Sequence, residues 1–444
     1  MDEFVILAVT GNPVAHSKSP QIQNAALTAA GITGTYLRLA ANSAQDAIQS
    51  AKSIGISGMN VTSPFKEDML KLADELSAEA KEIGAVNTIT IKNGKLTGHN
   101  TDPDGAVGAL VGNGVEVKGK EVVILGAGGA AKAAAFGLIK AGAKLTIANR
   151  TVSKAKEIAR KFGCDFCTLD NEDNQFRESM SKTNVVVSTL STGEKVVDPK
   201  LLRKEMIIFD AVYGKETQLT KDGKAAGCRL ISGEEWLLFH GVKTFEILTG
   251  RKVSIEVLRK ALSKTNPNSK TKTNIALIGL MGSGKTTVAE NISKITGMKS
   301  VEIDSEIEKA AGKKISEIFE EDGEAVFREF ERKEIAAIAK ADETVVSCGG
   351  GAILDGQNVQ TLRENSNIVW LYATPKTVMA RTEGDKSRPL LNVENKEEKI
   401  KEILQKRLKL YAGASDLLVN TENHTPLELA EHIARELGKE VDVK

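Results

Sequence analysis

Two glycine-rich segments of this chain have the residue types and spacing that hold nucleotide phosphates. The first reads GAGGAA at residues 126–131, and the second reads GLMGSGKT at residues 279–286. Each follows a short apolar run, at residues 122–125 and 275–278, and each opens a helical pattern, so the phosphates would rest at a helix N-terminus. The first spacing predicts a dinucleotide site and the second a nucleoside triphosphate site. Two different cofactor sites in one chain indicate two linked enzymes.

The first loop carries the glycines that a bound dinucleotide requires. Gly126 allows the tight turn after the strand, and Gly128 lets the backbone approach the pyrophosphate. The next strand, expected over residues 144–148, ends in Asn149 and Arg150 and not in the acidic residue that would bind a ribose 2′-hydroxyl. An arginine at that place favours a 2′-phosphate, which predicts NADP as the cofactor, with a simple glycine-rich turn as the alternative. The expected NADP-binding residues are Gly126, Ala127, Gly128, Gly129, Ala130, Asn149, Arg150, Thr151 and Lys154.

The second loop matches the pattern GxxxxGK[ST], in which backbone N–H groups surround the phosphates. Lys285 would contact the β- and γ-phosphate oxygens, and the hydroxyl of Thr286 would bind magnesium. The motif predicts ATP or GTP binding but does not identify the acceptor, because GTPases, ATPases and small-molecule kinases share it. The expected nucleotide-binding residues of this loop are Gly282, Ser283, Gly284, Lys285, Thr286 and Thr287.

Alternating strand and helix patterns surround both loops and predict an α/β fold. Before residue 102, apolar strands at residues 5–9, 58–61 and 88–91 alternate with helical patterns at residues 20–30 and 68–80. Later, the polar segment SKTNPNSKTKT lacks an apolar period, which indicates a linker. The expected units are an α/β substrate-binding domain at residues 1–104, completed by helices at 233–262, a Rossmann NADP-binding domain at 105–232, the linker at 263–273, and a P-loop kinase domain at 274–444 whose parallel sheet is flanked by helices.

The overall composition is that of an ordinary globular protein. The 444 residues leave room for about three domains. A formal net charge of +1 argues against a nucleic-acid surface, and no apolar run is long enough to predict a membrane span. Acidic Asp2 and Glu3 stand where a signal peptide would be basic, so we expect a cytoplasmic protein that acts on small molecules.

Cys164 and Cys167 form a CxxC pair without a second pair at zinc spacing, and we assign them to a strand without chemistry.

Several separated motifs resemble two known enzyme families. Residues 1–262 resemble shikimate dehydrogenase through GNPVAHSKSP, GMNVTSPFK, GAVNT, GHNTDPDG, GAGGAA and NRT, in this order. Residues 274–444 resemble shikimate kinase through GLMGSGKTT, IFEEDGEAVFREFE, SCGGGA, SRPLL and KRLKLY. The resemblance implies a bifunctional enzyme of aromatic amino acid biosynthesis, which reduces 3-dehydroshikimate to shikimate with NADPH and then phosphorylates shikimate with ATP and Mg²⁺. The sequence does not indicate an oligomeric state.

In the first half, the resemblance implies a catalytic pair and a set of substrate-binding side chains. Lys66 and Asp102 would be the pair, because a positioned ammonium stabilises or protonates the oxyanion that hydride transfer creates, while a carboxylate orients it. Nothing in their spacing predicts that they meet. The residues that would bind 3-dehydroshikimate are Ser17, Ser19, Asn60, Thr62, Asn87, Tyr213 and His240, together with Asp102.

This half also departs from the family pattern. His240 stands where the family usually has a glutamine that reaches the substrate. Residues 188–190 read Ser-Thr-Leu where Asn-Ala-Thr is usual near the nicotinamide, and residues 214–215 read Gly-Lys where Asn-Pro is common. These departures leave two alternatives open: a preference for quinate, and a dehydrogenase domain that only senses NADP(H) and substrate beside a working kinase.

In the second half, the resemblance implies a carboxylate clamp, an acceptor contact and a lid. Arg328 and Arg407 would bind the shikimate carboxylate as planar bidentate donors, and Asp304 would meet the acceptor hydroxyl. These features speak against a further alternative, a nucleotide-driven switch without a small-molecule substrate. The remaining assignments are Lys285 and the lid residue Arg388 as catalytic cations, Gly349, Gly350 and Gly351 against the substrate ring, Arg381 near the adenine, and Thr286 and Glu302 at the magnesium ion, where Glu302 replaces the usual aspartate.

Overall fold

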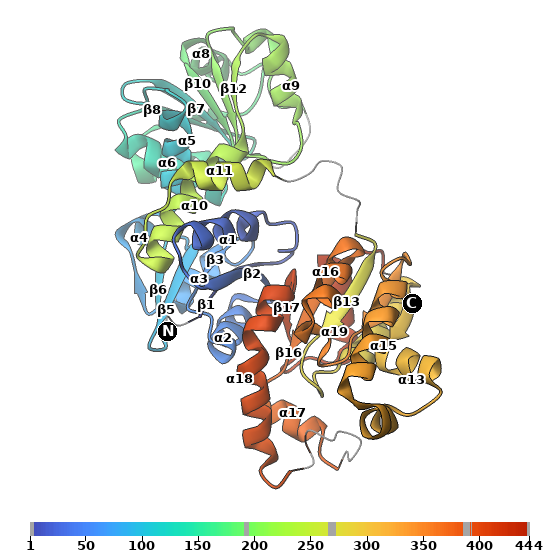
Figure 1. The fold of residues 1–444 in the computed structure, drawn as a ribbon. Coiled ribbons are helices and arrows are strands. Elements are labelled where there is room, and N and C mark those ends of the chain that lie inside the picture. Colours follow the sequence, from blue (N-terminus) through green and yellow to red (C-terminus); the bar gives the residue numbers. More distant parts are fainter. Residues whose placement is uncertain (1–3, 191–194, 265–271, 385–390, 392, 442–444) are drawn as a thin grey trace.

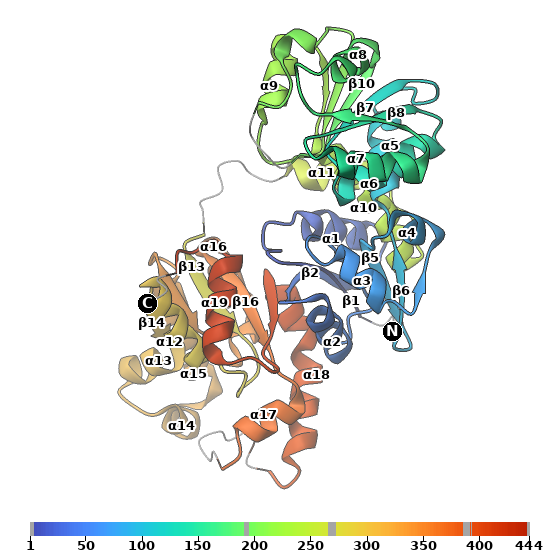
Figure 2. The ribbon, with the colours of Figure 1, turned by 180° about the vertical axis from the view of Figure 1, so that it is seen from behind.

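Three α/β units follow one another along the chain (Figure 1). The structure is a computed structural model, which describes residues 4–190, 195–264, 272–384, 391 and 393–441. Seen from two sides, the unit that contains the GAGGAA loop lies at one end of the molecule, and the C-terminal unit lies beside the N-terminal one (Figures 1 and 2). The α/β fold expected from the sequence is confirmed, and most strand pairs are parallel.

The first unit is built around β1, whose run VILAVTG is almost wholly buried, as expected for a central parallel strand covered on both faces. Two helices from later in the chain, α10 and α11, pack against this unit. Its elements are β1 (Val5–Gly11), α1 (Ser19–Ala29), β2 (Gly34–Ala40), α2 (Ala44–Ile54), β3 (Gly58–Val61), α3 (Lys66–Leu72), β4 (Glu75–Leu76), α4 (Ala78–Ile83), β5 (Thr88–Lys92), β6 (Lys95–His99), α10 (Gly233–Thr249) and α11 (Ile255–Ser263).

The helical pattern expected over residues 68–80 is wrong as one helix, because a short edge strand divides it. The backbone N–H of Asp74 donates to the carbonyl of Leu96 over 2.9 Å, and the Asp74 carboxylate accepts from the Leu96 N–H over 2.7 Å. Ser77 then caps α4 by accepting from the N–H of Ala80. Pairing with β6 therefore outweighs the local helix propensity.

The second unit is a six-stranded parallel sheet in the order β12-β11-β10-β7-β8-β9. Helix α5 leads into it from the first unit and lies against α10. Gly105, Gly108 and Gly112 bring the two helices close, because a Cβ atom at any of them would collide with Trp236 or Phe239 of α10. The elements of the unit are α5 (Asp102–Gly112), β7 (Glu121–Leu125), α6 (Gly129–Lys140), β8 (Lys144–Asn149), α7 (Val152–Phe162), β9 (Asp165–Thr168), α8 (Asn174–Lys182), β10 (Val185–Ser188), η1 (Pro199–Leu201), β11 (Ile207–Asp210), α9 (Gln218–Ala225) and β12 (Arg229–Ile231).

The third unit has five parallel strands in the order β14-β15-β13-β16-β17, with helices on both faces. Its first strand, β13, ends directly before the second glycine-rich loop. The elements are β13 (Asn274–Ile278), α12 (Lys285–Thr296), β14 (Lys299–Glu302), α13 (Ile303–Ala311), α14 (Ile315–Glu317), the π-helical η2 (Ile318–Asp322), α15 (Gly323–Ile338), β15 (Thr344–Ser347), η3 (Ala352–Leu354), α16 (Gly356–Asn365), β16 (Ser366–Tyr372), α17 (Pro375–Arg381), α18 (Lys396–Ala414), β17 (Leu417–Asn420) and α19 (Pro426–Glu436).

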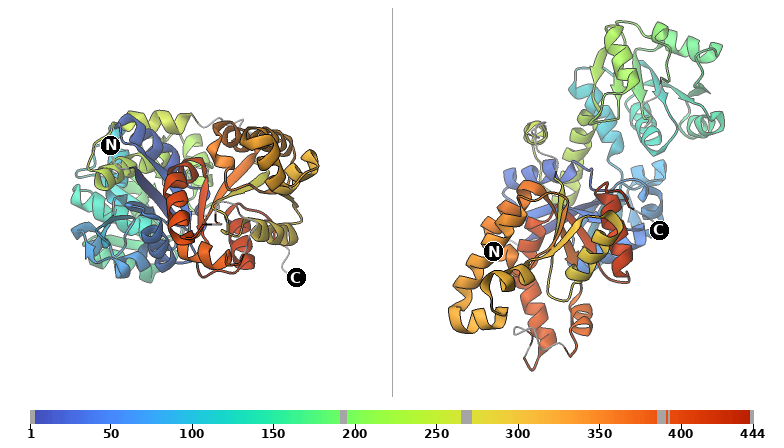
Figure 3. Two further views of the ribbon diagram at one scale, coloured as in Figure 1. Left: turned by 60° about the horizontal axis from the view of Figure 1, so that its bottom comes forward. Right: turned by 90° about the vertical axis from the view of Figure 1, so that its right-hand side faces the viewer.

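The first and third units share one sheet of eleven strands. Strand β17 pairs in parallel with β2, with Leu418 opposite Leu39 and Val419 opposite Ala40. Buried residues of both units belong to the same hydrophobic clusters on the two faces of this sheet. The left view of Figure 3 shows the two units side by side, and the right view shows the second unit at one end of the molecule. The C-terminal unit is therefore packed on the N-terminal unit and is not merely tethered to it.

Candidate active sites

A cavity of about 220 Å³ opens where the carboxyl ends of β1 and β3 face helix α10. Its walls come from the loop after β1, the strand β3, the first residues of α3 and α5, and one face of α10. Ala130, at the start of α6, also lines it, so the GAGGAA loop reaches the same space. The cavity brings together all nine side chains expected at the first site: Ser17, Ser19, Asn60, Thr62, Lys66, Asn87, Asp102, Tyr213 and His240.

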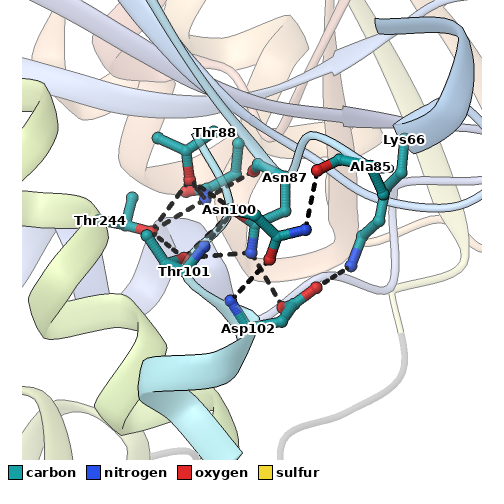
Figure 4. A network of polar contacts seen from close by, with 9 residues as sticks. Lys66, Ala85, Asn87, Thr88, Asn100, Thr101, Asp102 and Thr244 are labelled. Atoms are coloured by element: carbon teal, nitrogen blue, oxygen red, sulfur yellow. Dashed lines mark hydrogen bonds and ion pairs between the residues drawn. The ribbon is translucent and has the colours of Figure 1, made fainter. Parts of the chain in front are cut away.

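Lys66 and Asp102 form an ion pair in this cavity, with 2.6 Å between Nζ and Oδ2 (Figure 4). Lys66 is the first residue of α3 and Asp102 the first of α5, so two helix N-termini meet here. The second carboxylate oxygen of Asp102 accepts from Nδ2 of Asn87 over 2.9 Å. Burial would raise the pKa of Asp102, but Lys66, His240 and this hydrogen bond outweigh burial and leave the pKa below its usual value. The carboxylate therefore stays ionised and orients the ammonium.

A network of buried polar groups fixes the floor of the cavity (Figure 4). The Oδ1 atom of Asn87 accepts from the backbone N–H of Thr101 over 2.9 Å, and Nδ2 of Asn60 donates to Oγ1 of Thr244 over 3.2 Å. The hydroxyl of Tyr36 donates to Oδ1 of Asn60 over 2.6 Å. Tyr36, Thr101 and Thr244 were not predicted from the sequence. Thr244 could have been predicted, because it lies four residues after His240 and therefore on the same face of the helix.

His240 contributes a neutral imidazole to the wall. Burial lowers its pKa to about 4, although Asp102 opposes the shift, while Lys66 adds to it. Its buried Nδ1 atom has no hydrogen-bond partner among the described residues. A buried polar atom without a partner on the wall of a cavity is where a bound polar molecule would supply the missing hydrogen bond.

The GAGGAA loop has the geometry that a dinucleotide requires. Gly126 has φ +111°, which favours glycine, and a Cβ there would lie 2.5 Å from Oγ1 of Thr189. A Cβ at Gly128 or Gly129 would meet no atom within 4 Å, so the start of α6 is open to a ligand. Arg150 is exposed at the end of the neighbouring strand β8. The residues thus fit a pyrophosphate on the helix N-terminus with positive charge nearby.

The other residues expected to bind NADP after β8 lie at the surface. Asn149 donates to the carbonyl of Thr151 over 3.0 Å, and Thr151 and Lys154 are exposed.

A second cavity, of about 550 Å³, lies over the carboxyl ends of β13, β14 and β15. Ser283 is buried in the loop behind its wall, and Arg388 lies outside the described residues. The cavity is lined by the other expected residues: Gly282, Gly284, Lys285, Thr286, Thr287, Glu302, Asp304, Arg328, Gly349, Gly350, Gly351, Arg381 and Arg407.

The phosphate end of this cavity pairs a hydroxyl with a carboxylate. The hydroxyl of Thr286 donates to Oε1 of Glu302 over 2.7 Å, while Nζ of Lys285 donates to the backbone carbonyls of Gly279 and Leu280 over 3.0 and 3.1 Å. Hydroxyl and carboxylate oxygens suit Mg²⁺, which usually keeps waters and phosphate oxygens as further ligands. Within the described ranges, no group of three or more His, Cys, Asp or Glu side chains is arranged to hold a metal ion.

The opposite end of the cavity gathers arginines around the glycine run. Arg328 pairs with the buried Glu331 over 2.9 Å, and Nη1 of Arg407 donates to the carbonyl of Gly350 over 2.9 Å. A Cβ at Gly351 would lie 2.8 Å from the Arg328 guanidinium, so the glycine leaves room for that side chain. Burial raises the pKa of Glu331, although Arg328 opposes the shift. Glu331, the residue that orients Arg328, was not predicted from the sequence. At the adjoining edge, Arg381 donates to Oγ1 and the carbonyl of Thr421.

The cysteines lie away from both cavities, except Cys348, which lines the second. Cys167 is buried on β9, as the strand assignment expected, whereas Cys164 lies directly before that strand. Burial raises the pKa of the Cys164 and Cys167 thiols to about 11 and that of Cys348 to about 12, so these groups are thiols at neutral pH. None of the helices in the described part of the chain combines the length and the hydropathy that a membrane crossing needs.

Three regions of the chain match family models. Residues 9–89 match the shikimate dehydrogenase substrate binding domain, and residues 110–211 match the shikimate / quinate 5-dehydrogenase model. Residues 281–438 match the shikimate kinase model. The second cavity lies wholly within residues 281–438. The first draws Asn60 and Lys66 from residues 9–89 and Ala130 from residues 110–211, whereas Asp102 and His240 stand outside the matched regions.

Individual relatives match the first part of the chain over nearly their whole length. Shikimate dehydrogenase (NADP(+)) of Aquifex aeolicus is 39% identical over 264 residues, which cover 58% of this chain and 96% of that protein. The crystal structure of shikimate dehydrogenase from Aquifex aeolicus has a TM-score of 0.55 at 37% identity, over 58% of this chain and 97% of that one. Shikimate 5-dehydrogenase from Thermus thermophilus, in complex with NADP(H) and shikimate, has a TM-score of 0.54 at 31% identity, over 59% and 99%.

Proposed function

The chain belongs to the shikimate dehydrogenase family and carries a shikimate kinase domain behind it, and from this premise we propose that it performs two consecutive reactions. The first reduces 3-dehydroshikimate to shikimate with NADPH. The second transfers a phosphoryl group from ATP to shikimate and gives shikimate 3-phosphate. Reduction creates the ring hydroxyl group, and the kinase uses the product of the first reaction as its substrate.

The proposal assigns residues 1–104 with 233–262 to substrate binding, 105–232 to NADP(H) and 274–444 to the kinase, with 263–273 as the linker. The linker is largely outside the described residues. A small-molecule enzyme with these cofactors is expected to work in the cytoplasm. The observation that carries the dehydrogenase assignment is the first cavity, where nine expected side chains surround one space and Ala130 of the dinucleotide loop shares the wall.

In the dehydrogenase site, we assign Lys66 to the carbonyl oxygen of 3-dehydroshikimate. NADPH, when bound, would supply the hydride. The Lys66 ammonium would stabilise the developing oxyanion and donate a proton to it, and Asp102 would hold the ammonium in place. Ser17, Ser19 and the Asn60 network would bind the remaining polar groups. Neutral His240 would accept or donate one hydrogen bond in the place of the usual glutamine amide.

In the kinase site, Arg328 and Arg407 would bind the shikimate carboxylate, and Asp304 would orient the hydroxyl that attacks the γ-phosphate. Mg²⁺, when bound with ATP, would neutralise phosphate charge beside Thr286 and Glu302. Lys285 would exchange its two carbonyl partners for phosphate oxygens. We assign Arg388 to the transferring phosphoryl group from the sequence pattern alone, since it lies outside the described residues.

Two separate assays test the two reactions. Oxidation of NADPH by 3-dehydroshikimate without ATP reports the dehydrogenase, and ADP formation from ATP and shikimate without NADPH reports the kinase. With all reagents present, mass spectrometry should detect shikimate and then shikimate 3-phosphate. ADP formation without NADPH oxidation would leave the sensor alternative standing, and faster turnover of quinate with NADP⁺ than of shikimate would establish the other preference.

A further inference from the structure

The loop between β1 and α1, residues 12–18, carries Ser17 into the first cavity, and we call it the substrate loop. It makes few hydrogen bonds within itself: the Ser17 N–H donates to the Val14 carbonyl over 3.0 Å, and the Ser19 N–H donates to Oγ of Ser17 over 3.3 Å. Its shape therefore depends on what lies around it.

The C-terminal helix of the kinase unit, α19, supplies one of those surroundings. Oε2 of Glu436 accepts from the backbone N–H of Val14 over 2.7 Å and from that of Ala15 over 2.9 Å. Glu436 is only 6% exposed, and Val14 is fully buried. Two successive N–H groups that converge on one carboxylate oxygen form an anion-binding turn, in which the oxygen satisfies two backbone donors at once.

A second link between the kinase unit and the same loop runs through Arg38 of the first unit. The guanidinium of Arg38, on β2, donates from Nε and Nη2 to the Ser17 carbonyl over 3.1 and 2.6 Å. Its Nη1 atom donates to the carbonyl of Asp416 over 3.3 Å, and Asp416 precedes β17 of the kinase unit. Arg38 thus fixes Ser17 and touches the kinase unit at once. The two contacts hold opposite ends of the loop, at residues 14–15 and at Ser17.

Packing around Glu436 supports a fixed position for its carboxylate. Val14 belongs to the same buried cluster as Leu429 and Ile433 of α19. His432, one turn before Glu436, has Nδ1 2.6 Å from Oδ1 of Asn42 in the first unit. Helix α19 is thus held against the first unit by apolar packing on Val14 and by the contact between His432 and Asn42. The Glu436 carboxylate therefore has little freedom to move away from the substrate loop.

We propose that Glu436 is a positioning residue for the dehydrogenase reaction, so that the kinase domain completes the substrate site of the dehydrogenase domain. This inference rests on the proposed function of the first cavity. Glu436 does not line that cavity and acts through the substrate loop, which presents Ser17 to 3-dehydroshikimate. The two domains are then joined for a structural reason as well as for consecutive chemistry.

The test compares Glu436→Ala, Glu436→Asp and Glu436→Gln in the full-length chain. Both N–H groups donate to one oxygen, so the amide oxygen of glutamine can replace it, while alanine has no acceptor. Aspartate withdraws the acceptor by about 1.5 Å, the length of one C–C bond. We expect Glu436→Ala to raise the KM for 3-dehydroshikimate about tenfold with little change in kcat, Glu436→Asp to raise it less, and Glu436→Gln to stay within about twofold of the wild type.

Matched controls separate positioning from general damage. Glu431 lies on the same helix and is more exposed, so Glu431→Ala should leave the KM unchanged. Kinase activity should be the same in all variants, because the Glu436 carboxylate contacts the other domain. Hydrogen–deuterium exchange gives a direct readout: the amides of Val14 and Ala15 should exchange faster in the alanine variant and at the wild-type rate in the glutamine variant.

An unchanged KM in Glu436→Ala, or equal KM increases in the alanine and glutamine variants, would overturn the inference. So would a loss of kinase activity that parallels the dehydrogenase defect. If Glu436→Ala does not fold, Glu436→Asp decides by the same criteria. If the wild-type chain oxidises no NADPH with 3-dehydroshikimate, the proposed function fails by itself. The positioning role is then scored by amide exchange and by calorimetric binding of shikimate, which Glu436→Ala should weaken.

Discussion

The ion pair between Lys66 and Asp102 allows a sharp test of the dehydrogenase chemistry through Lys66→Met. Methionine keeps an unbranched side chain that is only one atom shorter and removes the charge. The pair spans 2.6 Å, and the two side chains are only 25% and 11% exposed, so water screens it less than a surface pair. Loss of a positioned proton donor typically costs about 10²–10⁴ in rate, or about 3–5 kcal/mol of activation free energy. We expect a decrease of that size in kcat for NADPH oxidation.

The KM for 3-dehydroshikimate should change much less than kcat, because Ser17, Asn60 and Asn87 keep their places. Removal of the cation should also raise the pKa of Asp102, since Lys66 now helps to lower it. Any acidic limb in the rate profile that reports Asp102 would therefore move to higher pH. The matched control is Lys71→Ala, because Lys71 lies on the same helix, is exposed and pairs with Asp68. A kcat for Lys66→Met within about threefold of the wild type, or an equal loss in the control, would refute the reasoning.

Four further predictions concern other residues. Burial lowers the pKa of His240 to about 4, so the imidazole is neutral above about pH 5. His240→Gln should therefore leave the pH profile of kcat/KM unchanged above that pH. A change of kcat/KM near pH 6.5 that is present in the wild type and absent in the variant would contradict this. Arg150→Ala should raise the KM for NADPH about tenfold and leave that for NADH unchanged. Arg407→Lys should weaken shikimate binding to the kinase by about 10–100-fold without slowing NADPH oxidation. Burial also lowers the pKa of His432 to about 4, below its unfolded value of 6.5. The contribution of neutral His432 to the free energy of unfolding is therefore complete above pH 6.5 and decreases as the pH falls to about 4. In denaturant titrations, His432→Gln should make this decrease smaller.

The residues expected to bind phosphate could be chosen from the sequence because the pattern that names them is local. Lys285 and Thr286 are adjacent in one motif, and a strand followed by a helix is enough to place them. Glu302 meets Thr286 because β14 ends at the same sheet edge, which parallel pairing makes predictable. The Lys66–Asp102 pair was different. Their 36-residue separation gives no signal, and they meet only because helices α3 and α5 begin at the same end of the first unit.

The substrate network was only partly readable. Thr244 follows His240 by one helical turn, and this spacing on an expected helix was sufficient to suggest a shared face. Tyr36 gave no such signal, because its strand β2 is apolar along most of its length and a buried tyrosine there reads as core. The expected helix at residues 68–80 failed because an edge strand is a matter of tertiary pairing, which local propensity does not report.

The joint sheet follows from a pattern that was present in both halves. Strand β17, with the sequence LLVN, is buried throughout, and β2, with the sequence GTYLRLA, is mostly apolar and mostly buried. In separate proteins these strands would be sheet edges, where an unpaired apolar strand invites aggregation. Pairing them removes two such edges at once and places Glu436 against the substrate loop. Because shikimate leaves the first site by diffusion, the short linker does not by itself raise its concentration at the second, so shared folding is the stronger physical reason for joining the two enzymes.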